Sequence, residues 1–246
     1  MKKILTILVF MLLGFNLSGQ LMSPAVGASQ SSAVRTYEDV IDDYGVAWHV
    51  GAVANYTTVG DTVISQWDDE TGNGNHLTQG GIAARPHYSG SVVTFDGADD
   101  WMKDDYVLVQ PTFLFLVIKQ VTWTIWDKLI DGYTGGGGAL YQHTTTPKVK
   151  PYAGAYDGEI SPTRDTWVII RVLWHGASSK IILNGGVPVT GNFGTTDMDG
   201  IILGAASGGG SPSDCAFQEV IVFSSALSSA DETLVLDHLN DTYTIY

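Results

Sequence analysis

Aromatic side chains gather where they could stack on the apolar faces of sugar rings. Sugar-binding sites set Trp or Tyr rings against such faces and add a few polar groups around them. Each of these aromatics could instead be a core residue, but their density over residues 123–156 predicts a binding face there. The candidates, in or near expected loops and strand ends, are Trp101, Trp123, Trp126, Tyr133, Tyr141, Tyr152 and Tyr156.

Two acidic segments offer oxygen ligands. The loop 68–75 carries carboxylates and amides, with glycines that allow left-handed backbone angles. Calcium takes about six to eight oxygen ligands of these kinds. The alternative is a tight turn held by Asx hydrogen bonds without metal. In the segment 96–100, Asp99 and Asp100 could likewise face a ligand or cation, or cap backbone amides of a turn.

Catalytic patterns are missing, so no catalytic residue is predicted. None of the five glutamates begins the Glu-x-Asp-x-Glu strand of laminarinase-type glucanases, and no Gly-x-Ser-x-Gly elbow is present. The histidines show no spacing typical of metal ligands. Retaining glycoside hydrolysis needs two carboxylates about 5 Å apart, and a pair such as Asp127 and Asp131 keeps that alternative open.

The elements that must position these residues are mostly strands. Short runs rich in β-branched and aromatic residues alternate with Gly-rich turns, and Asn184-Gly185-Gly186 marks a hairpin. One helix is expected from Ser228 to about Tyr243, with a capping serine and early acids. This pattern predicts an all-β, two-sheet antiparallel jelly-roll sandwich with one short C-terminal helix. The expected strands are Thr62–Trp67, Ser91–Phe95, Tyr106–Val121, Trp167–Trp174, Lys180–Leu183, Val187–Val189, Ile201–Leu203 and Phe217–Phe223.

The net charge and the cysteine content limit the classes of function and partner that the sequence supports. The 246 residues carry 12 basic and 26 acidic side chains, a formal net charge of −14 that argues against a nucleic-acid partner. A single cysteine, Cys215, excludes an intrachain disulfide and is expected to be a small buried apolar residue.

The first residues read as an export signal. Lys2 and Lys3 precede an apolar run, Ile4–Phe15, that is too short for a comfortable membrane span. We expect a signal peptide over residues 1–28, a leader over 29–45 and one domain over 46–246. Cleavage near Gly19-Gln20 and an uncleaved anchor are the alternatives. The chain is therefore expected to be secreted or on the cell surface, by bacterial-type export, with no membrane insertion after cleavage.

Two stretches resemble a known family. The first contains Ser65-Gln66-Trp67-Asp68-Asp69, Thr71-Gly72-Asn73-Gly74-Asn75, Arg85-Pro86 and Phe95-Asp96-Gly97; the second runs from Phe217 through Leu236 to Tyr243. Together they resemble the bacterial and phage branch of the laminin-G-like, concanavalin A-like superfamily. Thr71 stands where serine is common, a change that keeps the hydroxyl. The resemblance implies a possible structural calcium ion held by Asp68, Asn73, Asn75 and, from the last strand, Gln218 or Glu219.

That superfamily contains lectins, adhesins, virion proteins and some hydrolases, so the resemblance leaves function open. The favoured hypothesis is a secreted, non-catalytic carbohydrate-binding or adhesive protein, with a glycan or cell-surface polysaccharide as partner. A structural or assembly subunit that contacts itself or a partner protein is the first alternative. A glycoside hydrolase with an atypical Asp pair is the second.

Overall fold

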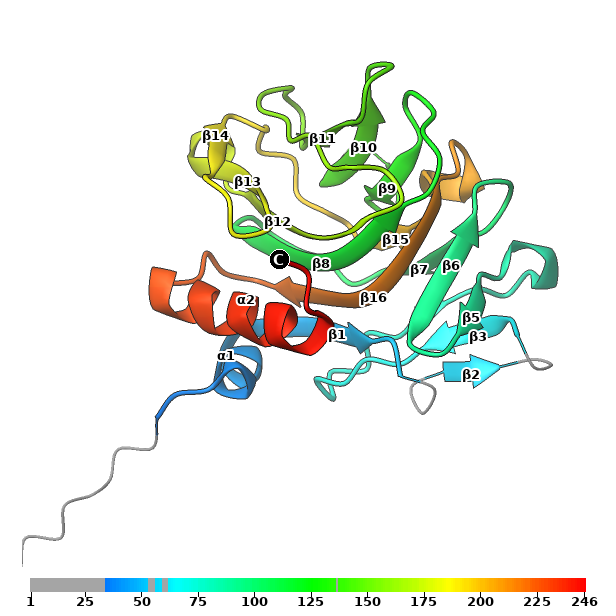
Figure 1. Ribbon diagram of the computed structural model, residues 1–246, viewed down its shortest axis with the longest axis horizontal. Coiled ribbons are helices and arrows are strands. Elements are labelled where there is room, and N and C mark those ends of the chain that lie inside the picture. The colour runs from blue at the N-terminus through cyan, green and yellow to red at the C-terminus, as the bar shows by residue number, and fades with distance from the viewer. Residues whose placement is uncertain (1–33, 53–55, 59–61, 136) are drawn as a thin grey trace, which may run out of the picture. The chain divides into compact units, whose positions relative to one another are not determined.

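The strand runs form two antiparallel sheets that pack against each other (Figure 1). The computed structural model describes residues 34–52, 56–58, 62–135 and 137–246. The expected signal peptide lies outside these residues. The two-sheet antiparallel sandwich expected from the sequence is confirmed.

Sheet A has the strand order β14-β13-β12-β8-β16-β6-β5, and β1 pairs with the other half of β16. Its strands are β1 (Gly45–Val50), β5 (His87–Ser89), β6 (Val92–Asp96), β8 (Thr112–Gln120), β12 (Trp167–Trp174), β13 (Ser179–Leu183), β14 (Val189–Gly191) and β16 (Asp214–Phe223).

Sheet B has the order β11-β10-β9-β15-β7-β4-β3-β2. Its strands are β2 (Tyr56–Thr58), β3 (Ile64–Trp67), β4 (Leu77–Thr78), β7 (Met102–Asp104), β9 (Lys128–Asp131), β10 (Ala139–His143), β11 (Lys148–Tyr152) and β15 (Ile201–Leu203). Short 3₁₀ turns occur at Ile82–Ala84, Gly176–Ser178 and Ser207–Gly209.

The main core lies between the sheets. Alternate residues of facing strands fill it, including the fully buried Trp67 and Trp174. Cys215 on β16 is buried in the same cluster, as expected, and burial raises the pKa of its thiol well above the usual value. Because alternate strand residues point to opposite faces, the neighbours of these core residues define the two outer faces.

Two helices cover the outer face of sheet A (Figure 1). α1 (Tyr37–Tyr44) and α2 (Ser229–Tyr243) contact each other and pack on a second apolar cluster that includes Phe113 and Phe115 of β8. Strands β8 and β16 are therefore buried on both faces, which explains the continuous apolar runs Phe113–Ile118 and Val220–Phe223. Among the described residues no helix is long and apolar enough to cross a membrane.

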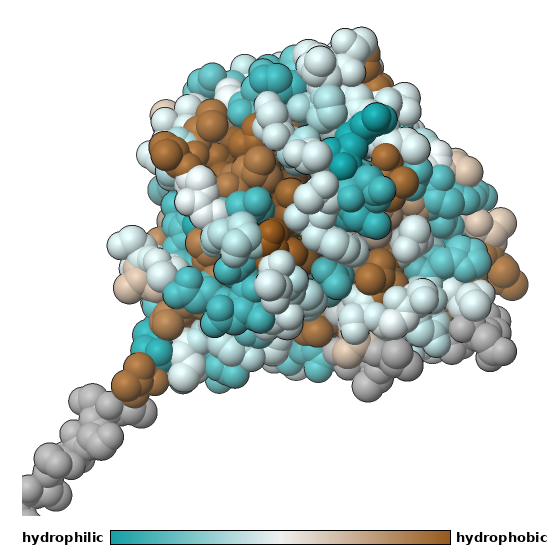
Figure 2. Space-filling model, viewed as in Figure 1, coloured by the Kyte–Doolittle hydropathy of each residue, from teal (hydrophilic) through white to brown (hydrophobic). Residues whose placement is uncertain are grey.

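α1 corrects the expected organisation, because part of the predicted leader over 29–45 is helical. Thr36 and Asp39 form a reciprocal capping box that starts the helix. The β13–β14 connection is also longer than the predicted turn over residues 184–186: Asn184 has a φ of 51°, but β14 begins at Val189 rather than Val187. Hydrophobic residues gather over this end of the molecule (Figure 2), and Val187 is 87% exposed.

Candidate functional site

The outer face of sheet B carries most of the predicted aromatics together with lysines. Tyr141 on β10 pairs with Lys128 on β9 and with Lys150 on β11, so these three side chains share one face. Lys103 on β7 pairs with Ile202, which pairs with Asp131 on β9. We call this surface the aromatic–lysine face; it comprises Trp101, Lys103, Trp126, Lys128, Tyr133, Tyr141, Lys150, Tyr152 and Tyr156.

Four of the aromatics form one continuous group. Trp126 is stacked on Tyr141 with ring centroids 5.4 Å apart, Tyr156 meets Tyr141 edge-on at 6.1 Å, and Tyr152 stacks on Tyr156 at 4.4 Å. Tyr141 is 1% exposed and forms the floor, whereas Trp126 and Tyr156 are 54% and 59% exposed. Burial raises the pKa of Tyr141, and its hydroxyl has no hydrogen-bond partner among the described residues.

The loop that presents Trp126 is fixed from below by Gln142. The Trp126 amide donates to the Gln142 carbonyl at 2.8 Å, and the Gln142 side-chain oxygen accepts the Thr124 amide at 2.7 Å. Trp126 has a φ of 77°, a left-handed angle that is strained for a bulky residue. Such strain costs roughly 1–3 kcal/mol and is found most often at functional positions. The fold therefore holds an exposed ring in a costly orientation.

The other end of the face contains a cavity of about 370 Å³ lined in part by Trp101, Lys103 and Tyr133. The Lys103 ammonium donates to the Tyr133 hydroxyl at 3.0 Å and lies 5.5 Å from the Trp101 ring. Gly209, at a φ of 80°, lies so close to Trp101 that a β-carbon there would come within 2.8 Å of the indole nitrogen. The cavity volume falls within the usual range for small-ligand sites.

The structure thus brings six of the seven predicted aromatics to one face. Trp123 is the exception: its indole donates to the Thr144 carbonyl at 2.7 Å, and its ring packs against the main core. The lysines of the face were missed by sequence reasoning. The alternation Lys148-Val149-Lys150-Pro151-Tyr152, with its buried and half-buried residues in turn, is the signal that could have found Lys150.

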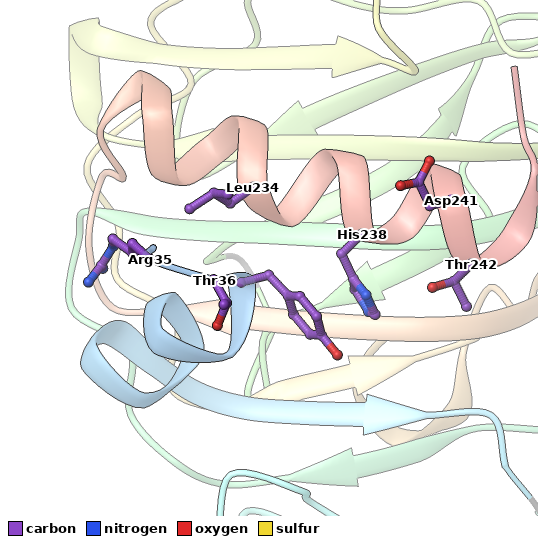
Figure 3. A pocket seen from close by; sticks show the side chains of 7 residues that line it. Arg35, Thr36, Leu234, His238, Asp241 and Thr242 are labelled. Atoms are coloured by element: carbon purple, nitrogen blue, oxygen red, sulfur yellow. The ribbon is translucent and has the colours of Figure 1, made fainter. Parts of the chain in front are cut away.

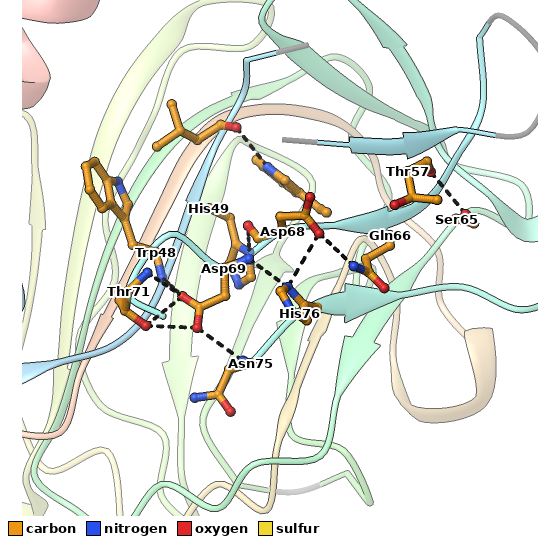
Figure 4. Close-up of polar contacts among 12 residues, drawn as sticks. Trp48, His49, Thr57, Ser65, Gln66, Asp68, Asp69, Thr71, Asn75 and His76 are labelled. Carbon is orange, nitrogen blue, oxygen red and sulfur yellow. Dashed lines mark hydrogen bonds and ion pairs between the residues drawn. The ribbon is translucent and has the colours of Figure 1, made fainter. Parts of the chain in front are cut away.

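The predicted calcium loop is densely hydrogen-bonded (Figure 4). The Asp69 carboxylate accepts the backbone amides of Trp48, Thr71 and Asn75 and the Thr71 hydroxyl. Burial raises the pKa of Asp69, but these hydrogen bonds outweigh it and lower the pKa below its usual value. The central carboxylate of the loop therefore has protein partners for its charge.

The four predicted calcium ligands are divided between two places. Asp68, Asn73 and Asn75 share the loop; Asn73 and Asn75 donate through their side-chain nitrogens to the Val46 carbonyl. Asp68 accepts the Gln66 side-chain amide at 2.6 Å. The oxygens of the two asparagine side chains accept no hydrogen bond from the described residues.

Glu219 lies instead under α2. It is 1% exposed, and its two carboxylate oxygens accept the Trp48 indole N–H at 2.6 Å and the Tyr243 hydroxyl at 2.7 Å. The His238 ring nitrogen is 3.5 Å from the same carboxylate. Both oxygens are therefore engaged beneath the helix rather than at the calcium loop.

A cavity of about 480 Å³ lies between α1 and α2, next to this buried group (Figure 3). His238 lines it and stacks on Tyr37 with ring centroids 3.6 Å apart. Arg35 at its rim is paired with Asp43 and Asp231. The Tyr37–His238 stack and the Arg35–Asp231 ion pair thus join the α1 end of the chain to α2.

The acids at 96–100 also have local partners. The Asp100 carboxylate accepts the Asp96 amide at 3.1 Å, and the Asp96 carboxylate accepts the Ala98 amide at 2.8 Å. Oxygens of Asp96, Asp99 and Asp100 lie within 4.8 Å of one another. These contacts match the turn in which acids bind backbone amides.

The Asp127–Asp131 pair has unequal surroundings. Asp131 is 4% exposed on the outer face of sheet B, and Asp127 comes just before β9. Four residues along an extended strand span roughly 13 Å, more than either glycosidase arrangement uses. Burial raises the pKa of Asp127 with no contribution from Asp131. The arrangement gives this pair little support as a hydrolytic centre.

Comparison with known proteins adds evidence on the fold. No protein-family description and no curated protein matches the chain. A Trypanosoma rangeli sialidase in complex with sialic acid aligns with a TM-score of 0.57 at 14% identity, over 80% of this chain and 33% of that chain. An arabinofuranosidase complexed with arabinofuranosyl-alpha-1,2-xylobiose gives 0.61 at 16% identity, over 83% and 64%.

A GH54 arabinofuranosidase soaked with a cyclic sulfate inhibitor gives a TM-score of 0.63 at 15% identity, over 83% of this chain and 65% of that chain. The chain thus spans about a third of the sialidase and less than two thirds of the arabinofuranosidases. At such identities the likeness shows the β-sandwich fold alone.

Proposed function

We propose that this protein is a non-catalytic carbohydrate-binding or adhesive protein of the concanavalin A-like type, and that it binds glycan on the aromatic–lysine face. The observation that carries the proposal is the exposed Trp126 ring, held at a strained backbone angle on the buried Tyr141. Structural neighbours named as a sialidase and as arabinofuranosidases add support at the level of carbohydrate recognition.

Stacking explains how the face would bind a sugar. Rings that are already packed and oriented lose little conformational entropy when a ligand arrives. Tyr156 and Trp126 offer exposed faces, and Lys128 and Lys150 offer donors beside them. A sugar would therefore meet apolar surface and hydrogen-bond donors together, which is the usual composition of such sites.

Removal of the Trp126 ring tests the proposal. Trp126→Gly relieves the backbone strain while deleting the stacking surface, so we expect affinity for a bound glycan to fall by about tenfold or more while the fold is retained. Tyr44→Ala removes a partly exposed ring from α1, on the other sheet, and is expected to leave affinity unchanged.

Glycan-array screening followed by titration calorimetry gives the readout. Circular dichroism melting of each variant shows whether the fold persists. Absence of binding to every glycan at millimolar concentration would reject the proposal, as would unchanged affinity in folded Trp126→Gly.

Calcium at the loop 68–75 remains part of the proposal. The side-chain oxygens of Asn73 and Asn75 and the Asp68 carboxylate are the groups that would contribute. A ligand that binds only the native state raises stability by mass action. We therefore expect millimolar calcium to raise the melting temperature and EDTA to reverse the rise, whereas Asn73→Ala should abolish it. An identical melting temperature in both solutions would reject the site.

A further inference from the structure

We propose that the glycan bound by the aromatic–lysine face is an anionic polysaccharide. This inference rests on the proposed function and adds the chemical class of the ligand. Its evidence is the way in which cationic side chains are distributed in an otherwise acidic protein.

Within the described part of the chain, the lysines of the face have no carboxylate within ion-pair distance, although Asp131 attracts Lys128 electrostatically. The whole chain has 26 acidic and 12 basic residues, and most described cations elsewhere are paired: Arg35 with Asp43 and Asp231, Lys119 with Asp165, and Arg171 and Lys180 with Glu232. Arg85 and Arg164 are the described exceptions; Arg85 donates to backbone carbonyls, and Arg164 lies in an exposed loop. Among the described residues, Lys103, Lys128 and Lys150 also form no ion pair. Lys148 on β11 is paired with Glu159 and so is excluded from this set.

Each of these three ammonium groups lies over an aromatic ring of the same face. The Lys103 nitrogen is 4.4 Å from the Tyr133 centroid, that of Lys128 is 4.8 Å from the Tyr141 centroid, and that of Lys150 is 5.9 Å from the Tyr156 centroid. Cation–π attraction places the ammonium beside the ring. A sugar stacked on the ring would thus have its substituents next to a positive charge.

The three lysines lie on alternate strands of sheet B. They come from β11, β9 and β7, which are separated by β10 and β15 (Figure 1). Strands are about 4.8 Å apart, so the successive lysine backbones are separated by at least roughly 10 Å across the sheet. A polymer crossing the strands would meet a cation repeatedly, whereas a single small sugar would meet only one.

Acidic residues on and beside the face indicate which lysines contribute most to the binding of an anion. Asp131 is on the face but 4% exposed. Asp104 and Asp105 line a smaller cavity of about 150 Å³ with Lys103 and Tyr133. An anion is therefore repelled more at Lys103 than at Lys150, so we expect Lys150 to contribute more to binding.

Paired polymers that differ in charge test the inference. Polygalacturonate and its fully methyl-esterified form share one backbone, and only the first is anionic; dextran sulfate and dextran form the second pair. We expect binding to polygalacturonate to exceed binding to its ester by about tenfold, and to weaken between 50 mM and 500 mM NaCl because salt screens exposed charges.

Charge-removing variants give the matched controls. Lys150→Gln should weaken polygalacturonate binding by about threefold or more, and Lys103→Gln by less. Arg164→Gln removes an equal charge from an exposed loop before β12 and should have no effect. Melting curves confirm that each variant is folded.

The possible outcomes separate the two proposals. Equal binding to polygalacturonate and its ester would overturn the anionic ligand and leave glycan binding intact. Binding to dextran sulfate that is no stronger than binding to dextran would likewise contradict attraction by the lysines. Binding to no polymer and no array glycan would reject the proposed function itself.

Discussion

Asp100 shows how burial changes the chemistry of a single side chain. It is 3% exposed. Burial, together with repulsion from Asp96 and Asp99, raises the pKa of Asp100 to about 6, against the lowering effect of the backbone hydrogen bond from Asp96. An unfolded aspartate has a pKa of about 3.9. The folded protein therefore keeps this proton at pH values where the unfolded chain has lost it.

This difference predicts a pH dependence of stability. The contribution of Asp100 is fully present below pH 4 and is lost as pH rises through 6, because ionisation then costs the folded state more. Between pH 5 and pH 7.5 the wild type should lose about 1–2 kcal/mol of unfolding free energy from this group, and Asp100→Asn should remove that loss. Urea unfolding at both pH values measures it, with exposed Asp42→Asn as the control. Parallel pH profiles for wild type and Asp100→Asn would contradict the assignment.

At the residue scale, sequence could identify candidate aromatics but not their grouping. Whether Tyr141 faces ligand or core depends on its register with Lys128 and Lys150, and a shift of one residue would reverse it. That register cannot be predicted from the hydrophobic periodicity of the sequence, because Gly-rich turns and the bulge between Leu140 and Tyr141 interrupt the alternation. Trp123 lies three residues before Trp126, yet its ring packs against the core. This difference could not be predicted from the sequence either.

At the element scale, the long apolar strands and α2 were predictable, because period, length and caps agree there. α1 was missed because eight residues with two buried apolar side chains, Val40 and Ile41, give a weak helical period. Its capping box, Thr36 to Asp39, was the available signal. Its stability comes from packing against sheet A and α2 rather than from intrinsic propensity.

Truncation of Ile41 tests that view of α1. Ile41 is 3% exposed in the cluster between the helices and sheet A, so Ile41→Ala should reduce the unfolding free energy by about 2–4 kcal/mol. Asp42→Ala on the exposed side of the same helix should change it by less than about 0.5 kcal/mol. Chemical denaturation gives both values; equal effects would mean that α1 is only loosely attached.

At the scale of the whole molecule, the two sheets differ in what covers them. The helices occupy the outer face of sheet A, whereas the outer face of sheet B carries exposed Trp126 and Tyr156. Sequence predicted the sandwich but not this asymmetry, because α1 was absent from the expected elements. The covering helices leave the outer face of sheet B open for the proposed ligand.

The predicted export signal has its own test. When the full chain is produced in a bacterium, we expect the exported protein to begin at Ser29, because cleavage after Ala28 follows the apolar run. Intact-mass spectrometry of the extracellular fraction would identify the first residue. A product that begins at Met1 and stays with the membrane would contradict the prediction, and a start near Leu21 would select the earlier site.

The oligomeric state of the protein in solution tests the alternative that it is a structural or assembly subunit. A subunit that builds surface filaments should form higher-order species on size-exclusion chromatography, visible by electron microscopy. The exposed Val187 beyond β13 would be a candidate contact for such species. A monomer that binds glycan would support the binding proposal over assembly.

The reactivity of the Cys215 thiol can be used to measure how often the sandwich opens. The thiol is the chain's single cysteine, fully buried between the sheets, and its raised pKa keeps it protonated. A thiol reagent can therefore react only when the sandwich opens, so native labelling should be at least about a thousandfold slower than labelling of the urea-unfolded chain. The labelling rate would then report how often the two sheets separate, without any engineered probe.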